Sequence, residues 1–151
     1  MRSIGLALLI ALGLVASAQA DGHLFKVLPQ YLDAKGRESL SPSLYDRDAY
    51  QAFLRQHPDK RAAFRFAVQW KISFVKSAAR KIRVQLRGTA QGGLPQETSV
   101  ELPLTESHAF RHWDYVTLDA EHYKSFGEIT AWRVTLWNGD EQLAEQKSFL
   151  W

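Results

Sequence analysis

Bulky apolar residues alternate with polar ones between positions 64 and 104, and this period-two pattern constrains the fold more than any other feature of the sequence. Every even position in 64–72 is large and apolar, and the same parity returns in 82–86 and 100–104. Successive side chains of a β-strand point to opposite faces, so this alternation is typical of strands with one face in a core. We therefore predict three strands whose even-numbered side chains fill one dry interior between two layers.

Four further segments are expected to be strands. Segment 25–33 is predicted as a first strand that Pro29 confines to an edge or a bend, because proline lacks the N–H that a central strand donates. Asn138-Gly139 predicts a tight type I′ hairpin turn, since both residues tolerate positive φ. The remaining expected strands are 113–118, 129–137 and a returning segment that ends at Trp151.

The fold class that follows is mainly β, an antiparallel immunoglobulin-like β-sandwich of about seven strands. The chain has no cysteine, so burial alone must hold the two layers together. Four of the five tryptophans lie between Trp70 and Trp137 and supply bulk for the core. Because the disulfide and the Cys-Trp-Cys spacing of antibody domains are missing, the term immunoglobulin-like describes architecture only.

One segment departs from the β pattern and predicts a short helix over 44–56, inserted between the first two strands. Ser43 is a suitable N-cap, Asp46 three residues later completes a capping box, and Pro58 ends the element. Spacings of three and four residues place the apolar side chains on one face, and we expect this face to pack against the sandwich. The face consists of Tyr45, Ala49, Ala52 and Phe53.

Residues 1–20 have the three regions of a cleavable secretory signal peptide. Arg2 supplies the positive charge, 4–15 is apolar, and the small-x-small pattern required by signal peptidase ends at Ala20. Cleavage after Ala20 leaves 21–151, which we expect to be one domain in the periplasm or outside the cell. The apolar run is too short to span a bilayer and no second one follows, so no transmembrane segment is expected after cleavage.

The charge of the exported chain is nearly balanced. Without the signal there are 18 basic and 16 acidic side chains, a net charge of +2, which does not suggest general binding to nucleic acid. Lys81, Arg83 and Arg87 form a basic stripe that would suit an anionic partner. The neighbouring run carries Glu97 and Glu101 on the equivalent face, so we favour cross-strand ion pairs as the explanation.

Two histidine arrangements raise the question of a metal site. The spacing of His108 and His112 would place two ligands on one helical face, but both lie in a predicted loop that enters a strand. Cleavage after residue 20 would expose the amine of Asp21 before Gly22 and His23, which gives the square-planar nitrogen set that Cu(II) and Ni(II) prefer. This arrangement resembles the amino-terminal copper- and nickel-binding motif of serum albumins.

No combination of residues predicts catalysis. Asp46 and Asp48 flank Arg47 near the expected helix start, but two residues apart on a helix their side chains diverge, and acids in a first turn are favoured by the helix dipole. The sequence contains no G-x-S-x-G elbow, P-loop, dinucleotide fingerprint or zinc-protease helix. We assign no catalytic, cofactor-binding or metal-binding residue and no cofactor.

Three segments carry a resemblance to a known family. They are Ser41–Gln51 (SPSLYDRDAYQ), Ala131–Trp137 (AWRVTLW) and Gln146–Trp151 (QKSFLW). Together they resemble a family of small uncharacterised exported bacterial proteins. The resemblance implies export and one compact domain, and it implies no activity or ligand.

These observations favour a non-enzymatic binding or interaction module of the cell envelope, with a protein or glycan partner. The expected contact surfaces are an exposed sheet edge or the groove between helix 44–56 and the sandwich. A small cell-envelope hydrolase is the first alternative, and it requires a pocket where titratable residues converge. Copper or nickel handling through Asp21-Gly22-His23 is the second.

Overall fold

The structure is a computed structural model, and it describes residues 21–73, 79–90, 92–105 and 110–151. The predicted signal peptide, residues 1–20, lies outside the described residues. Within the described part of the chain, no helix is long and apolar enough to cross a membrane.

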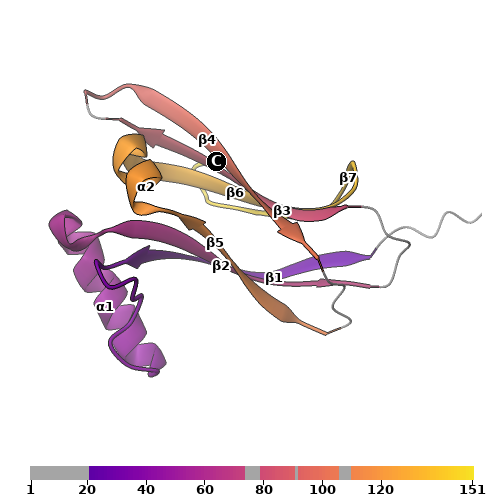
Figure 1. Cartoon of the computed structure of the whole chain (residues 1–151), viewed down its shortest axis with the longest axis horizontal. Coiled ribbons are helices and arrows are strands. Elements are labelled where there is room, and N and C mark those ends of the chain that lie inside the picture. The colour runs from indigo at the N-terminus through magenta and orange to yellow at the C-terminus, as the bar shows by residue number, and fades with distance from the viewer. Residues whose placement is uncertain (1–20, 74–78, 91, 106–109) are drawn as a thin grey trace, which may run out of the picture.

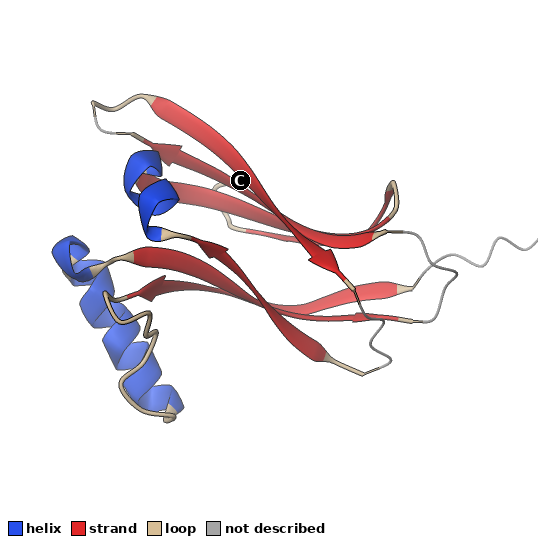
Figure 2. Ribbon diagram, viewed as in Figure 1, coloured by secondary structure: helices blue, strands red, loops and turns tan. Residues whose placement is uncertain are grey.

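The described residues form two antiparallel sheets that face one another, as Figures 1 and 2 show, so the predicted mainly-β class is confirmed. One sheet has the strand order β1-β2-β5 and the other β4-β3-β6-β7. The first consists of β1 (Gly22–Leu32), β2 (Ala63–Ile72) and β5 (His112–Leu118). The second consists of β3 (Arg80–Thr89), β4 (Pro95–Leu104), β6 (Glu128–Asn138) and β7 (Glu141–Lys147).

The even-numbered apolar side chains fill the space between the sheets, as predicted. Those of β2 are at most 4% exposed and those of β3 at most 1%. Their counterparts on β4 (Val100, Leu102 and Leu104) are only partly buried, because β4 is an edge strand and has one neighbour in its sheet. Trp70 is the tryptophan that lies wholly in this core, and the other four are half-buried.

The edge position predicted from Pro29 is confirmed. β1 pairs only with β2, and Pro29 lies opposite Phe66 in that pairing. A proline is tolerated there because the outer side of β1 has no strand that would require its N–H.

The last hairpin differs from the prediction in register and in turn type. Asn138 is still paired with Glu141, so the two loop residues are Gly139 and Asp140. Gly139 has φ +59°, and no described non-glycine residue has positive φ, which is the pattern of a type II′ turn and not of type I′. The returning strand also ends earlier than expected, at Lys147, and Trp151 is not part of it.

Helix α1 (Leu44–Gln56) has the predicted bounds and lies between β1 and β2 in the chain. The Ser43 side chain accepts from the Asp46 N–H, as an N-cap should. The return bond of the predicted capping box is not made to the Ser43 N–H. Instead the Ser41 hydroxyl bridges the two groups, accepting from the Ser43 N–H and donating to the Asp46 carboxylate.

The face that α1 turns toward the sandwich is not the predicted one. Tyr45 is 81% exposed and Phe53 40% exposed, whereas the buried residues of the helix are Gln51 and Leu54. The apolar stripe therefore faces outward, and a buried amide takes its place at the contact with the sheet.

A second helix, α2 (Ala120–Phe126), was not predicted. Asp119 caps it by accepting from the His122 N–H, and Gly127 follows it with φ +87°. A short 3-10 helix, η1 (Pro58–Lys60), follows α1. Both α-helices lie at the same end of the sandwich (Figure 1).

Candidate functional site

The basic stripe forms ion pairs with its neighbour strand, as predicted. Arg83 contacts Glu101 at 2.7 Å and Arg87 contacts Glu97 at 2.8 Å, each pair directly opposite in the β3–β4 register. Lys81 reaches Glu101 at 3.1 Å. These cations therefore already have partners on a solvated sheet face and do not form a site for an anion.

The predicted acidic and histidine pairs do not converge either. Asp46 is held by Ser41, and Asp48 pairs with Arg47 at 3.0 Å. His108 lies outside the described residues, and His112 lies 3.8 Å from Asp114, which also accepts from the Trp70 indole N–H at 2.8 Å. Within the described residues no three His, Cys, Asp or Glu side chains are grouped as metal ligands.

Gly22 and His23 are the first two residues of β1, and Asp21 precedes them. Gly22 lies opposite Ile72 and His23 opposite Lys71, so the backbone that would wrap a square-planar metal is part of a paired strand. A Cβ at Gly22 would lie 2.6 Å from the Leu143 side chain of β7, so the other sheet packs closely against the first residue of β1. Metal binding here would compete with strand pairing.

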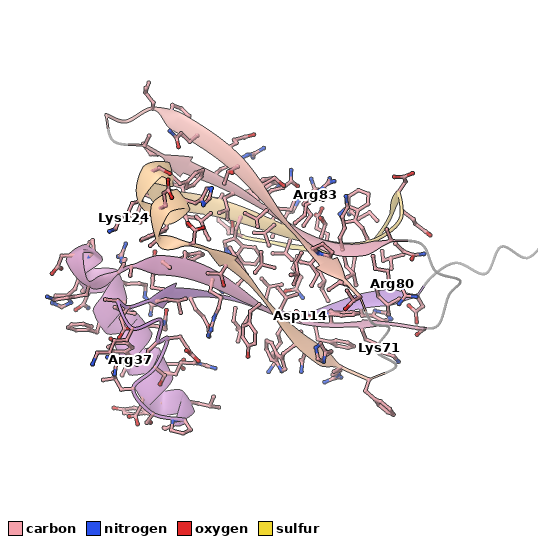
Figure 3. All side chains as sticks on the ribbon, in the orientation of Figure 1. Arg37, Lys71, Arg80, Arg83, Asp114 and Lys124 are labelled. Carbon is pink, nitrogen blue, oxygen red and sulfur yellow. The ribbon has the colours of Figure 1, made fainter. Side chains whose placement is uncertain are left out.

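A cavity of ≈ 490 Å³ lies where α1, η1 and α2 meet the end of β1. We call it the helix cavity. The predicted groove between helix 44–56 and the sandwich is a different and smaller hollow, because no strand residue lines the helix cavity. That hollow is lined by Leu28, Pro29 and Gln30 of β1 and by Arg47, Asp48, Gln51 and Arg55 of α1. Figure 3 shows Arg37 and Lys124 at the end of the molecule where the helix cavity lies. Its lining consists of Asp33, Ala34, Lys35, Arg37, Tyr50, Phe53, Asp59, Lys60, Arg61, Ala62 and Lys124.

Asp33 organises the loop that forms one wall of the helix cavity. Its carboxylate accepts from the backbone N–H groups of Lys35 at 2.8 Å and Arg37 at 2.9 Å, from the Arg37 Nε at 2.9 Å and from the Tyr50 hydroxyl at 2.8 Å. Burial alone would raise the pKa of Asp33, but these bonds outweigh it and hold the pKa well below its usual range. The Asp33 carboxylate is therefore held in its charged form, and Arg37 is its ion-pair partner.

Two side chains fix α1 beside this loop. The Gln51 amide accepts from the Tyr31 N–H at 2.9 Å and donates to the carbonyls of Tyr31 at 2.9 Å and Glu38 at 2.8 Å. The Arg61 guanidinium donates to the Leu54 carbonyl at 2.6 Å and lies 4.2 Å above the Tyr31 ring. Both residues are therefore occupied in positioning the helix.

The helix cavity is cationic. Five Lys or Arg side chains line it against two carboxylates. Asp33 is taken by Arg37 and Asp59 by Lys60 at 3.3 Å. For Lys35 and Lys124, no carboxylate of the described residues lies within 4 Å of the amine. An anion in this cavity would meet two ammonium groups that have no carboxylate partner among the described residues.

An apolar hollow of ≈ 370 Å³ adjoins the helix cavity and shares Tyr50 and Phe53 with it. These two rings are stacked, with centroids 5.8 Å apart. The other residues of the hollow are Leu40, Asp46 and Ala49. The site therefore joins a cationic part and an apolar part at a pair of aromatic rings.

The Asp33 carboxyl and the Tyr50 hydroxyl of the helix cavity both have shifted pKa values. A hydrolase that uses two carboxyls needs one with a raised pKa as general acid. Asp33 has a lowered pKa instead. The pKa of Tyr50 is raised by burial and by its bond to Asp33, so the hydroxyl keeps its proton. Titratable groups do meet here, as the hydrolase alternative requires, but Asp33 is not the general acid that such an enzyme needs.

Sequence reasoning pointed to the vicinity of helix 44–56, but it identified neither the helix cavity nor the residues that line it. The local signal was Asp33 followed by Gly36, which has φ +72° in a turn closed by the Asp33 carboxylate. The convergence of Lys35 with Lys124 carried no sequence signal, since 89 positions separate residues that only the fold brings to one cavity.

Comparisons with known proteins give one structural likeness. An immunoglobulin-like protein from Pseudomonas aeruginosa superposes with a TM-score of 0.41 and 12% sequence identity, over 87% of this chain and 96% of the other. No protein-family model matches the sequence, and no curated protein matches it either.

Proposed function

We propose that this protein is a non-enzymatic binding module of the cell envelope, and that the helix cavity binds the anionic group of its ligand. The observation that carries the proposal is the charge of the cavity lining, five cations against two carboxylates, with Lys35 and Lys124 left without an acidic partner among the described residues. Cations that converge on a concave surface attract anions and raise their local concentration.

The architecture we propose is immunoglobulin-like. The described residues form seven strands in a three-stranded and a four-stranded antiparallel sheet, which agrees with the smaller members of that class. The constant-type arrangement would place the fourth strand beside the fifth. Here β4 pairs with β3, which makes the sheet of β3 and β6 the larger one. Helix α1, inserted between the first two strands, is the addition that creates the site.

Export is part of the proposal. The basic, apolar and small-residue regions of 1–20 support a signal peptide cleaved after Ala20 and a periplasmic or secreted location. Membership in the family of small exported bacterial proteins that the SPSLYDRDAYQ and AWRVTLW segments resemble would fit the same location. Mass spectrometry of the protein from a periplasmic extract tests the cleavage point directly.

The binding proposal is tested with two anionic probes, tripolyphosphate and oligogalacturonate, by titration of the purified protein in an NMR amide spectrum. We expect shifts confined to 33–37, 59–62 and the vicinity of Lys124. The double variant K35Q/K124Q should bind about tenfold more weakly, since two exposed ion pairs contribute about 0.7 kcal/mol each.

The matched control is K71Q/K147Q, which removes the same charge elsewhere. Figure 3 shows Lys71 at the opposite end of the sandwich from Arg37 and Lys124. Equal weakening by both double variants would mean that only net charge matters. That result, or the absence of binding by either probe, would contradict the proposal.

A further inference from the structure

We infer that the ligand of the helix cavity is an anionic amphiphile, a single acyl chain with a carboxylate or phosphate head. This inference rests on the proposed function and adds the chemistry of the second half of the ligand. Its basis is that the Tyr50 and Phe53 rings line both the cationic cavity and the apolar hollow.

The shared rings connect the two parts of the site. The Tyr50 hydroxyl donates to Asp33 in the cationic part, while its ring and that of Phe53 form the wall of the apolar part. Phe53 is also stacked on His57, with centroids 4.2 Å apart, so the ring is held in place although it is 40% exposed. A chain lying across these rings would contact both hollows at once.

The apolar residues of the hollow include exposed side chains. Leu40 is 62% exposed, and Ala49 and Phe53 lie on the outward face of α1. A helix on the surface of a domain ordinarily carries polar residues on its outer face. Exposed apolar side chains that gather in one concave place mark a binding surface.

The charges fix the direction of the ligand. Asp46 lines the apolar hollow, and its carboxylate disfavours an anionic head at that rim. Lys35 and Lys124 line the other part. The head therefore lies toward the two lysines and the chain toward Leu40 and Ala49. A concave hollow of ≈ 370 Å³ favours a single chain over a flat lipid surface.

The test measures binding of butanoate, octanoate and dodecanoate to the purified protein by calorimetry, below the concentration at which each forms micelles. Affinity should rise about two- to fourfold per added methylene, the range between a half-covered and a fully buried chain. Dodecyl maltoside, which has the chain without the charge, should bind at least tenfold more weakly than dodecanoate. Dodecanoate and lauroyl lysophosphatidate represent the two sources of the head group, and the tighter binder identifies the source.

Two variants separate the halves of the ligand. L40S, at a residue that lines only the apolar hollow, should reduce the gain per methylene and leave tripolyphosphate binding unchanged. F53S, at a ring that lines both parts, should also reduce the gain per methylene. The control F149S removes a ring that is 100% exposed and far along the chain, and it should change neither. Because L40S alters a loop residue, it keeps the test valid if F53S weakens the helix.

The possible failures are distinguishable. Dodecanoate binding no tighter than butanoate, while tripolyphosphate still binds, would overturn the amphiphile inference and leave the proposed function intact. Absence of binding by every anion would overturn both. Binding to phosphatidylglycerol vesicles without binding of dodecanoate or lysophosphatidate would replace the single-chain ligand with a membrane surface.

Discussion

Gln51 connects helix α1 to the edge of β1 by hydrogen bonds, and its replacement by leucine tests how much these bonds stabilise the candidate site. The Gln51 amide bonds both the N–H and the carbonyl of Tyr31, as the peptide group of a neighbouring strand would. A third bond reaches the Glu38 carbonyl. The side chain is only 6% exposed, so water cannot readily take over these bonds in the variant.

The expected effect of Q51L follows from this count. Three hydrogen bonds at about 1 kcal/mol each give a loss of about 3 kcal/mol in the free energy of unfolding. For a domain of this size that corresponds to a fall of roughly 10 °C in Tm. Leucine has a similar volume, so little of the loss should come from a cavity. The measurement is urea unfolding followed by tryptophan fluorescence, with hydrogen exchange of the Tyr31 amide as a local readout.

The control for this prediction is Q56L, the same exchange at an exposed position of the same helix. Q56L should change the free energy of unfolding by less than about 0.5 kcal/mol, as most exposed substitutions do. If Q51L equals Q56L in stability and the Tyr31 amide keeps its protection, then Gln51 does not hold the helix. The account of the site as a rigid groove would then be wrong.

Three further predictions concern other parts of the molecule. G127A should lower the free energy of unfolding by at least about 2 kcal/mol in urea, because φ is +87° and a Cβ would lie 2.4 Å from the Thr89 carbonyl. G36A, where φ is +72° but the space is open, should lower it by about 1 kcal/mol. Equal losses would contradict the steric argument. Asp33 has a lowered pKa in the folded state, so its contribution to stability is fully present above the ordinary aspartate pKa of about 3.9 and declines as the pH falls toward the folded value. D33N should therefore be less stable at pH 7 and lose less stability than the parent between pH 4 and pH 2, and parallel profiles would refute this. A chain that begins at Asp21 should bind Cu²⁺ through one histidine, and H23A should abolish this binding. The metal should lower Tm because its binding competes with the pairing of β1, whereas a rise in Tm would show that the paired strand binds the metal.

The strands and their faces could be predicted because their signal is local and repeated. The parity of Phe64 to Ile72 fixed which side chains enter the core, and burial leaves a β-strand no freedom to shift by one residue. The pairing of Arg83 with Glu101 followed from the same parity on two neighbouring strands. The bounds of α1 followed from Ser43 and Pro58, which act on the backbone directly.

The type of the last hairpin turn and the helix α2 were not predicted, because at both places the local sequence is compatible with more than one backbone conformation. In the last hairpin, a ladder that includes Asn138 moved the turn by one residue, and Gly139 alone then supplied the positive φ. For α2, the Asp119 cap and Gly127 were visible in the sequence, but seven residues give too little periodicity to separate a helix from a turn-rich loop. The side chains Tyr31 and Phe64 stabilise α2 by packing against Tyr123, which is a tertiary contact.

The reversed face of α1 shows why the site itself could not be predicted. An amphipathic helix is expected to bury its apolar stripe, and that rule treats the surface beneath it as apolar. Here the surface beneath is the outer edge of β1, where the backbone groups of Tyr31 need hydrogen-bond partners. A buried glutamine satisfies them and an apolar side chain would not, so Gln51 takes the inner position and the stripe containing Phe53 turns outward. The exposed rings beside the lysines are thus a consequence of how the sheet edge is closed, and the ligand chemistry proposed for the cavity depends on that single inversion.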